Sequence, residues 1–403
     1  MSWDEVSLGE LEGIKGNFVD GPFGSNLKAS EYVETGVPLI QLKNIKPNRY
    51  IDKDLKFITQ DKADSLSRHL YQAGDVCIAK LGAVGTACII PENAANGIIV
   101  ADVVRFRGDK RRIDYKYLCH FLNSSLGQQR ILAFSRGSTR TRTNLGDLKK
   151  VKIPLPPLDE QKSIAAILDK ADAIRQKRKQ AIDLADDLLR SVFLDMFGDI
   201  NGIGESTVEE LAEDRKGSMR TGPFGSQLLH SEFTETGVSV LGIDNAVKNR
   251  FEWGKKRFIS HDKYSELNRY TVLPGDVLIT IMGTCGRCAV VPEDIQLAIN
   301  TKHLCCITLD KSKCLPEFLH SYFLYHPLAR RYLEKNTKGA IMSGLNMGII
   351  KAMPIPEFPL TMQKKYVGIA KMTEVSRHNR GEFESLCNTS FSSISQKVFS
   401  GKI

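Results

Sequence analysis

LDEQKSIAAILDKADAIRQKRKQAIDLADDLLRSVFLDMF, Leu158–Phe197, is the stretch that decides the fold. Its 40 residues contain neither proline nor glycine, whereas prolines precede it and Gly198 follows it. Small or apolar residues recur in steps of three and four, with Arg178 at the one polar step, namely at Ile164, Ile167, Ala171, Ile174, Ala181, Ala185, Leu188 and Val192. This heptad rhythm predicts a long coiled-coil helix, roughly 60 Å in length.

A second copy of this helix is expected in residues 360–403. A shift of 202 residues carries Gln161 onto Gln363 and Arg178 onto Arg380. The matched register predicts that the two helices pair as an antiparallel coiled coil. Two unrelated amphipathic helices are the alternative interpretation, although both seams place an arginine at the same step.

The rest of the chain is also written twice. DGPFGSNL, Asp20–Leu27, recurs 201 residues later as TGPFGSQL, Thr221–Leu228, and the AGDV that starts at Ala73 recurs as PGDV. Repetition over half the chain indicates a tandem duplication rather than a solenoid. We therefore expect a pseudo-two-fold molecule with two globular domains, 1–157 and 199–359, each followed by a long helix, 158–198 and 360–403.

Each globular half reads as mixed α/β (α+β). Runs rich in β-branched residues lie between Gly and Pro punctuation, and no strand alternates regularly with a long helix, so a doubly wound sheet is not expected. In the first half we expect strands at Val37–Gln41, Asp75–Lys80, Thr86–Ile90 and Ile98–Phe106, and helices at Asp114–Phe134 and Asn144–Lys149.

The composition is that of an ordinary soluble protein. The chain has 403 residues, 42% of them hydrophobic and 26% charged. A net charge of +9 is compatible with a nucleic-acid partner but does not by itself indicate one. The sequence shows no secretory signal and no apolar run long enough to span a membrane. Together with nine cysteines, this predicts a cytoplasmic protein with reduced thiols.

The Gly-Pro-Phe-Gly-Ser loops are the sharpest local motif. Glycine permits a positive φ and proline fixes a turn, so both loops should be rigid. Two interpretations stay open: a loop whose backbone approaches a phosphate or base, or a structural turn over a buried phenylalanine.

A second candidate segment is SRGSTRTRTNLGDLKKVK, Ser135–Lys152, which has six basic residues and one acid. Arginines interleaved with hydroxyls suit phosphate contacts and the reading of guanine, although a solvated charged face is the alternative. The second copy keeps Lys338, Ser343 and Asn346 but loses most of the arginines. If both copies bind DNA, they should read different sequences.

Catalytic and metal motifs are absent from the sequence. It has no phosphate-binding G-x-x-x-x-G-K-[ST], no H-E-x-x-H and no Gly-rich dinucleotide fingerprint. Cys285 and Cys288 form a C-x-x-C pair, but the first copy has Val84 and Ala87 at the same positions, so no metal site is expected.

The order of these motifs resembles the specificity subunits of type I restriction-modification systems. The resemblance covers essentially the whole chain: GPFGS, a T-G-V step, G-D-V, a G-x-x-G segment, and a Pro-rich exit into a long L-x-E-Q helix, all repeated once. It implies two target recognition domains that each bind half of a split DNA site, and two helices that set their separation. The second helix departs from the pattern, with Thr361 and Met362 where Asp159 and Glu160 stand.

The resemblance also implies partners and a set of DNA-contacting residues. Two modification subunits, which bind S-adenosylmethionine and methylate adenine, and restriction subunits would join the chain, which itself holds no cofactor. The candidate DNA-binding residues are Gly21, Phe23, Ser25, Asn44, Lys80, Arg136, Ser138, Arg140, Arg142, Asn144, Gly222, Phe224, Ser226, Asn245, Lys338, Ser343 and Asn346.

Two other functions remain as alternatives. One is a coiled-coil scaffold that does not bind DNA, which a salt-dependent affinity for duplex DNA would exclude. The other is a stand-alone DNA-modifying enzyme, which the missing catalytic motifs oppose and which S-adenosylmethionine binding by the isolated chain would revive.

Overall fold

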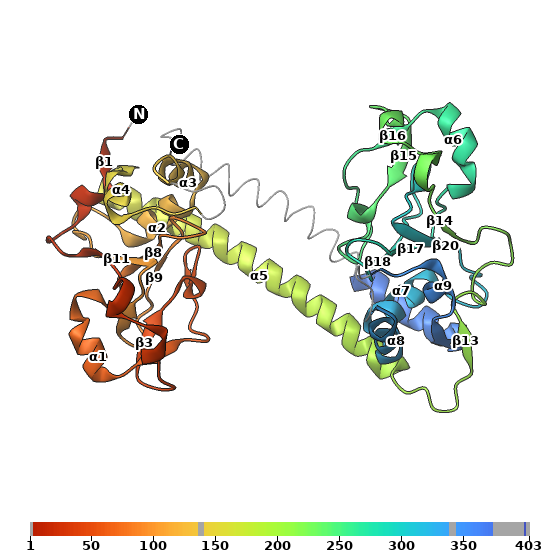
Figure 1. The fold of residues 1–403 in the computed structure, drawn as a ribbon, viewed down its shortest axis with the longest axis horizontal. Helices are drawn as coiled ribbons and strands as arrows, with labels where there is room; N and C mark the ends of the chain where they lie inside the picture. Colours follow the sequence, from red (N-terminus) through yellow and green to blue (C-terminus); the bar gives the residue numbers. More distant parts are fainter. Residues whose placement is uncertain (1–2, 136–140, 338–343, 374–398, 400–403) are drawn as a thin grey trace. The chain divides into compact units, whose positions relative to one another are not determined.

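The computed structural model describes residues 3–135, 141–337, 344–373 and 399. The chain divides into two compact units: unit 1 comprises residues 1–179 and 381–403, and unit 2 comprises residues 180–380. The long helix α5, Leu158–Phe197, crosses from the first unit into the second and matches the helix predicted from the sequence (Figure 1).

Unit 1 is built on two four-stranded sheets. The first is antiparallel, in the order β2 (Phe18–Asp20), β11 (Val103–Phe106), β8 (Val76–Ala79) and β9 (Ala87–Ile89). The second is mixed, in the order β6 (Lys56–Ile58), β3 (Val37–Ile40), β10 (Gly97–Ile99) and β7 (Leu70–Tyr71), with β3 and β10 parallel. Two-stranded pairs complete it: β1 (Glu5–Ser7) with β12 (Lys152–Pro154), and β4 (Ile45–Lys46) with β5 (Arg49–Tyr50). Its helices besides α5 are α1 (Gln60–Ser65), α2 (Tyr115–Asn123), α3 (Ser125–Leu132) and α4 (Leu145–Lys150).

Two expected elements of unit 1 are each divided in the structure. The run 98–106 forms two strands, because a turn at 100–103 moves the chain from one sheet to the other. The run 114–134 forms two helices, because Ser124 ends α2 and caps α3, its Oγ accepting the Gly127 N–H at 3.0 Å. The apolar pattern of the sequence does not reveal either break, because apolar residues continue on both sides of it.

Unit 2 repeats this architecture, which confirms the mixed α/β fold. Its antiparallel sheet has the order β14 (Met219–Thr221), β20 (Leu304–Ile307), β17 (Val277–Thr280) and β18 (Cys288–Val290). Its second sheet has the order β16 (Phe258–Ile259), β15 (Val238–Leu241) and β19 (Ala298–Asn300), and β13 (Glu205–Thr207) pairs with β21 (Pro354–Pro356). Its helices are α6 (His261–Leu267), α7 (Pro316–Tyr325), α8 (Pro327–Thr337) and α9 (Met347–Lys351). In both units apolar strands such as β8 and β17 are buried along their whole length.

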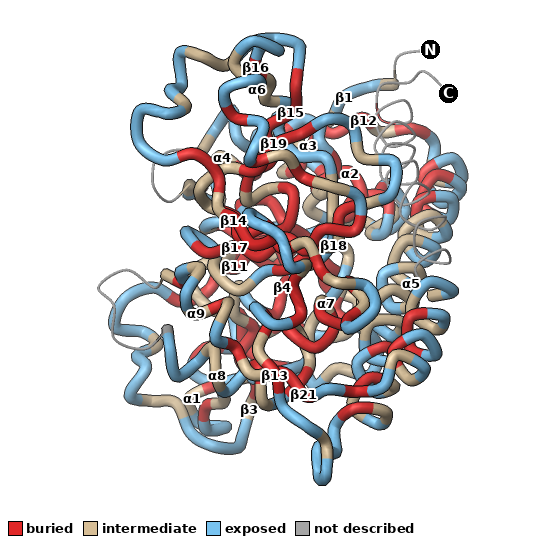
Figure 2. Tube along the Cα trace, turned by 90° about the vertical axis from the view of Figure 1, so that its right-hand side faces the viewer, coloured by how far each residue is buried: buried red, intermediate tan, exposed pale blue. Residues whose placement is uncertain are grey.

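The buried face of α5 differs from the predicted seam. Figure 2 shows buried, intermediate and exposed positions alternating along this helix. Three seam residues are half exposed: Ile167 (53%), Ile174 (49%) and Leu188 (54%). The segment predicted to pair with these positions is 374–398, so the seam stays a prediction there. The predicted pairing along 374–398, Arg380 included, lies outside the described residues.

Each unit takes the start of one long helix and the end of the other into its core. In unit 1, Phe399 lies edge-on to Tyr117 and Phe121, with ring centroids 5.4 and 5.3 Å apart. In unit 2, Phe197, the last residue of α5, lies 4.9 Å from the ring of Phe318 and 5.8 Å from that of Tyr366. The chain therefore leaves unit 1 through α5 and is back in unit 1 at Phe399.

A buried glutamine fixes each long helix to its domain. The Gln161 Oε1 accepts the Asp114 N–H at 2.8 Å, and its Nε2 donates to the Arg112 and Pro156 carbonyls, both at 2.9 Å. Gln363 repeats the arrangement: it accepts from Leu315 N and donates to the carbonyls of Lys313 and Phe358. Because both side chains are fully buried, each glutamine satisfies three backbone groups that water cannot reach.

His326 holds the end of α5 in unit 2. The Leu328 N–H donates to Nδ1 at 3.1 Å, so the neutral ring carries its proton on Nε2 and donates it to the Phe197 carbonyl at 3.0 Å. Burial lowers the pKa of His326, against the opposing effect of the Phe197 hydrogen bond. The folded protein therefore favours the neutral ring.

We predict that Gln161→Ala destabilises unit 1 by about 3 kcal/mol, because it strands buried backbone groups. Chemical denaturation of the variant and the parent measures this difference. Lys162→Ala is the matched control: its exposed side chain faces Asp159 at 3.7 Å, and it should change stability by less than about 0.5 kcal/mol. Equal stability of Gln161→Ala and the parent would contradict the role given to the glutamine.

We predict that His326 makes stability depend on pH. Since its folded pKa lies below the unfolded value, the unfolded state binds more protons in acid. The contribution is complete above about pH 6.5, the ordinary histidine pKa, and is lost as pH falls through the folded pKa. Denaturation of the parent and of His326→Gln at about pH 8 and about pH 5.5 should show a smaller acid loss in the variant. The same loss in both proteins would assign the effect to other groups.

Candidate nucleic-acid interface

The two GPFGS turns present an exposed phenylalanine from a rigid backbone. A Cβ at Gly21 would lie 2.1 Å from the Val100 carbonyl oxygen, and one at Gly222 would lie 2.0 Å from that of Asn300. The next glycine in each turn has φ +55°. Phe23 and Phe224 are each 50% exposed, so the interpretation of a turn over a buried phenylalanine is wrong. Ser25 and Ser226 beside them are exposed as well.

In unit 1, backbone hydrogen bonds join three further segments, around Lys80, Asp102 and Thr143, and the Lys80 side chain connects them to this turn. The Lys80 N–H donates to the Asp102 carbonyl at 2.8 Å, and the Lys80 carbonyl accepts from Thr143 N at 3.0 Å. The Lys80 Nζ lies 4.5 Å from the centre of the Phe23 ring and 3.1 Å from Asp20 Oδ2. The GPFGS turn, the end of β8 and residues 141–143 therefore form one surface, which we call the platform.

Unit 2 builds the same platform from different side chains. The Ile281 N–H donates to the His303 carbonyl at 2.9 Å, and the Ile281 carbonyl accepts from Leu345 N at 3.0 Å. Relative to unit 1, Ile281 stands for Lys80, Thr221 for Asp20, His303 for Asp102 and Gly344 for Arg142. The backbone is conserved between the copies, whereas the groups that face outward are not.

Arg142 is the described member of the basic segment that is best placed to bind DNA. Its side chain is 55% exposed and pairs with Asp102, with Nη2 at 2.7 Å from Oδ1. Such an exposed ion pair contributes little to stability, so the guanidinium can exchange the carboxylate for a phosphate or a base at small cost. The candidates Arg136, Ser138, Arg140, Lys338 and Ser343 lie outside the described residues.

Asn144 and Asn346 cap short helices at the edge of each platform. The Asn144 Oδ1 accepts the Asp147 N–H at 2.8 Å, and the Asn346 Oδ1 accepts the Ile349 N–H at 2.9 Å. Both residues are exposed. Their repetition in the sequence thus reflects a helix-capping role, and their exposure leaves contact with DNA open.

Three candidates are corrected by the structure. Asn44 and Asn245 are buried, and their side chains hold the following loop: Asn44 donates to the Ile51 and Lys53 carbonyls at 3.0 Å, and Asn245 donates to the Glu252 carbonyl at 2.9 Å. Lys80 is 2% exposed and paired with Asp20. These residues shape the platform and do not offer their side chains to a partner, because repetition in a sequence marks structural polar residues as well as contacts.

The G-D-V motif also has a structural role that sequence patterns did not reveal. Asp75 is held by both Nε and Nη2 of Arg107, at 2.6 and 2.8 Å. In unit 2 the equivalent Asp276 pairs with Arg220, which comes from a different strand, and accepts from Thr308 Oγ1 at 2.6 Å. The buried aspartate is constant while its arginine has moved, and only the strand pairing shows that both arginines reach it.

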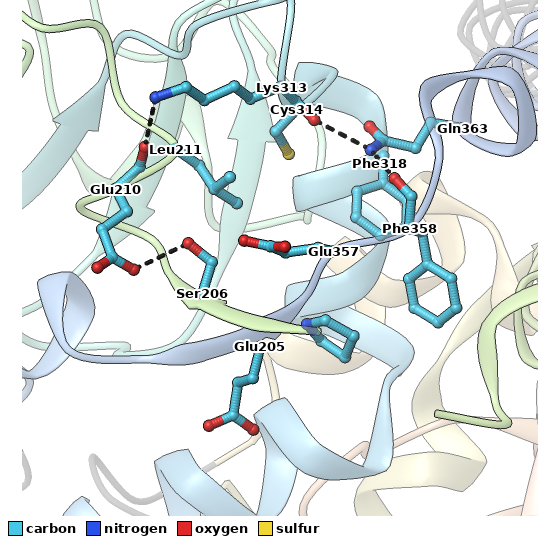
Figure 3. A pocket seen from close by; sticks show the side chains of 11 residues that line it. Glu205, Ser206, Glu210, Leu211, Lys313, Cys314, Phe318, Glu357, Phe358 and Gln363 are labelled. Carbon is cyan, nitrogen blue, oxygen red and sulfur yellow. Dashed lines mark hydrogen bonds between the residues drawn. The ribbon is translucent and has the colours of Figure 1, made fainter. Parts of the chain in front are cut away.

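Unit 2 has a second feature, an acidic cavity of about 530 Å³, drawn in Figure 3. It is lined by Glu205, Glu210 and Glu357, with an apolar wall that includes Phe318 and Phe358. The Gln363 that fixes the C-terminal helix lies at its edge (Figure 3). Three carboxylates repel phosphates, so this cavity does not belong to a DNA-binding surface.

The described residues contain no group of three or more His, Cys, Asp or Glu side chains that could hold a metal ion. Cys285 donates to the Ile281 carbonyl at 3.2 Å, and burial raises the pKa of the Cys288 thiol. No described helix combines the length and the apolar character needed to cross a bilayer.

Comparisons with known proteins agree on one kind of protein. Residues 2–184 match the family described as the type I restriction modification DNA specificity domain. The MjaVIII specificity subunit of Methanocaldococcus jannaschii is 22% identical over 304 residues, which cover 72% of this chain and 71% of the relative. The EcoKI specificity subunit of Escherichia coli K12 is 24% identical over 365 residues, which cover 82% of this chain and 74% of the relative.

Solved structures show the same fold. The type I specificity subunit from M. genitalium has a TM-score of 0.61 at 15% identity, with 99% of this chain and 96% of that chain covered. A chain from a structure concerned with assembly and conformational transition of a type I system has a TM-score of 0.51 at 15% identity, covering 100% and 98%.

We predict that Arg142→Ala weakens the binding of duplex DNA. A lost base contact costs roughly 1–3 kcal/mol at one position of the site, whereas a lost phosphate contact weakens all sequences and lowers the salt slope by about one. Titrations at two salt concentrations separate these outcomes. Arg111→Ala is the control, because Arg111 is also an exposed arginine paired with an aspartate, Asp109, and is not part of the platform. Unchanged binding by Arg142→Ala would remove this residue from the interface.

Proposed function

We propose that this chain, which belongs to the family of type I restriction-modification specificity subunits, reads a split and asymmetric DNA site and directs partner subunits to it. The chain is the non-catalytic member of such a system. The observation that carries the proposal is the duplicated platform: one backbone arrangement, built twice, with different outward side chains in each copy.

Two platforms with the same backbone but different side chains would recognise two different half-sites. At the positions that reach solvent, Arg142 and Asp102 make the first platform ionic, whereas Gly344 and His303 stand at the same positions of the second. Specific contacts to base edges depend on such side chains. Two long helices between the domains then set an unread spacer, as spacing between half-sites follows from protein geometry.

Catalysis would come from partner subunits. The proposed partners are two modification subunits, which bind S-adenosylmethionine and methylate adenine, together with restriction subunits, and the proposed compartment is the cytoplasm. The relatives are named as specificity subunits of restriction enzymes, and one structural neighbour comes from a study of complex assembly.

We predict that replacing residues 199–359 by a copy of 1–157 converts the target into two matching, inverted half-sites. The physical reason is that both platforms would then carry the same side chains on a pseudo-two-fold frame. Mapping methylated adenines in cells that contain the chain and its modification partner measures the site. The reciprocal chimera, with 199–359 in both places, should give the other inverted repeat. An unchanged asymmetric site after the first replacement would show that the second domain does not read DNA.

A further inference from the structure

Unit 2 has an exposed aromatic and basic loop that the platform does not include. This loop, residues 249–257, has the sequence NRFEWGKKR. Trp253 is 55% exposed and lies edge-on to Phe251, with ring centroids 5.3 Å apart. Lys255 and Lys256 are exposed, and their ammonium groups make no hydrogen bond or ion pair within the described part of the chain. A large ring and two unpaired cations in solvent are typical of a surface that meets a partner.

Hydrogen bonds of the Asp244 and Asn245 side chains hold this loop in a defined conformation. The Asp244 carboxylate accepts the Lys255 N–H at 2.6 Å and pairs with Arg257. A Cβ at Gly254 would lie 1.9 Å from Asp244 Oδ2, so only glycine allows this close approach. Asn245 holds the start of the loop through the Glu252 carbonyl. Trp253 is therefore presented from a fixed backbone, which lowers the entropy lost on binding.

The loop adjoins the platform of unit 2. Ile243, next to the Asp244 anchor, places its Cδ1 3.1 Å from where a Cβ of Gly283 would lie, and Gly283 is in the turn that follows β17 and the platform residue Ile281. Arg257 is also close to His303, whose pKa is lowered by burial, by Lys302 and by Arg257. The anchor of the loop and the platform therefore lie close together, at the Gly283 turn and His303.

The first copy lacks this loop chemistry. Its equivalent, residues 48–56, reads NRYIDKDLK, with three basic and two acidic residues, against four basic and one acidic in 249–257. Asp52 stands in place of Trp253 and Asp54 in place of Lys255. The basic 135–152 segment shows the opposite trend, since its second copy has lost most arginines. Each unit therefore has one strongly basic loop, in different positions of the repeat.

We propose that the 249–257 loop is a DNA-contacting element of unit 2, which holds duplex DNA beside the second half-site. This rests on the proposed function. Lys255 and Lys256 contact phosphates, whose charge they complement, and Trp253 packs its ring against the sugars and base edges of a groove, as apolar side chains do in other DNA-binding proteins. The loop thereby supplies the backbone contacts that the arginine-rich segment supplies in unit 1.

The first experiment measures duplex binding by the full chain with its modification partner, on DNA that carries the methylated site. Lys255→Ala with Lys256→Ala should weaken cognate and random duplexes alike and lower the slope of log affinity against log salt by about two. Trp253→Ala should weaken binding by about tenfold with little change in that slope. The control is Lys364→Ala with Lys365→Ala, which removes the same charge from exposed positions at the start of the C-terminal helix.

The second experiment uses Trp253 as its own reporter. The chain contains two tryptophans, Trp3 and Trp253, so Trp3→Phe leaves one. Acrylamide quenching of this variant should be strong without DNA and should fall when cognate duplex is added. Protection by the modification partner alone, with no further change on DNA addition, would overturn the proposal in favour of a protein-binding loop.

The outcomes separate this inference from the proposed function. If the parent shows no salt-dependent duplex binding, the proposed function fails and the loop proposal with it. If the parent binds its site, while the lysine variant keeps the parental salt slope and Trp253 stays fully quenchable in the complex, only the loop proposal is overturned.

Discussion

The buried glutamine at the start of each long helix is the constraint on which the molecule depends. A primary amide has one oxygen acceptor and two N–H donors, which is the set needed to satisfy one backbone N–H and two carbonyls. Gln161 and Gln363 use all three in the same way. The N-terminus of each helix is thereby fixed to the loop before α2 or α7 and to the strand exit before the helix. Helix α5 continues from one unit into the other. The hydrogen bonds of Gln161 fix the direction in which this helix leaves unit 1.

The far ends of the helices complete the cores that these starts begin. Phe399 packs on Tyr117 and Phe121, and Phe197 packs on Phe318. A buried aromatic ring contributes a large share of the apolar area of a small core. The core of unit 1 is therefore completed by a residue from the far end of the chain, whereas that of unit 2 is completed by the end of α5, which directly precedes its globular part.

The two units have the same backbone arrangement, but the ion pairs within them differ. Lys116 pairs with Asp169 in unit 1, whereas Glu317 pairs with Lys371 at the same place in unit 2, so the ion pair has reversed its polarity. Asp75 and Asp276 are both buried and paired, but with arginines from different strands. An ion pair needs charge neutrality and satisfied hydrogen bonds, and it has both whichever of its two positions carries the acid. The same freedom acts on the platforms, where Arg142 corresponds to Gly344 on an unchanged backbone, and the proposal of two distinct half-sites rests on this divergence.

The long helix, the duplication and the mixed α/β class followed from the sequence alone, because periodicity, repeated motifs and Gly or Pro punctuation are local signals. The exposure of Phe23 and the burial of Asn44 and Lys80 did not. The sequence shows that a residue recurs. Only the arrangement of the strands decides whether its side chain is exposed, as in Phe23, or buried and hydrogen-bonded to backbone groups, as in Asn44. The burial of Leu168 and Leu189, which lie off the predicted seam, was likewise decided by packing of the helix ends against each unit. The neighbourhood of the 249–257 loop, the Gly283 turn and His303 is a property of the tertiary fold, because these segments are distant in the chain and meet only when the sheets of unit 2 are formed.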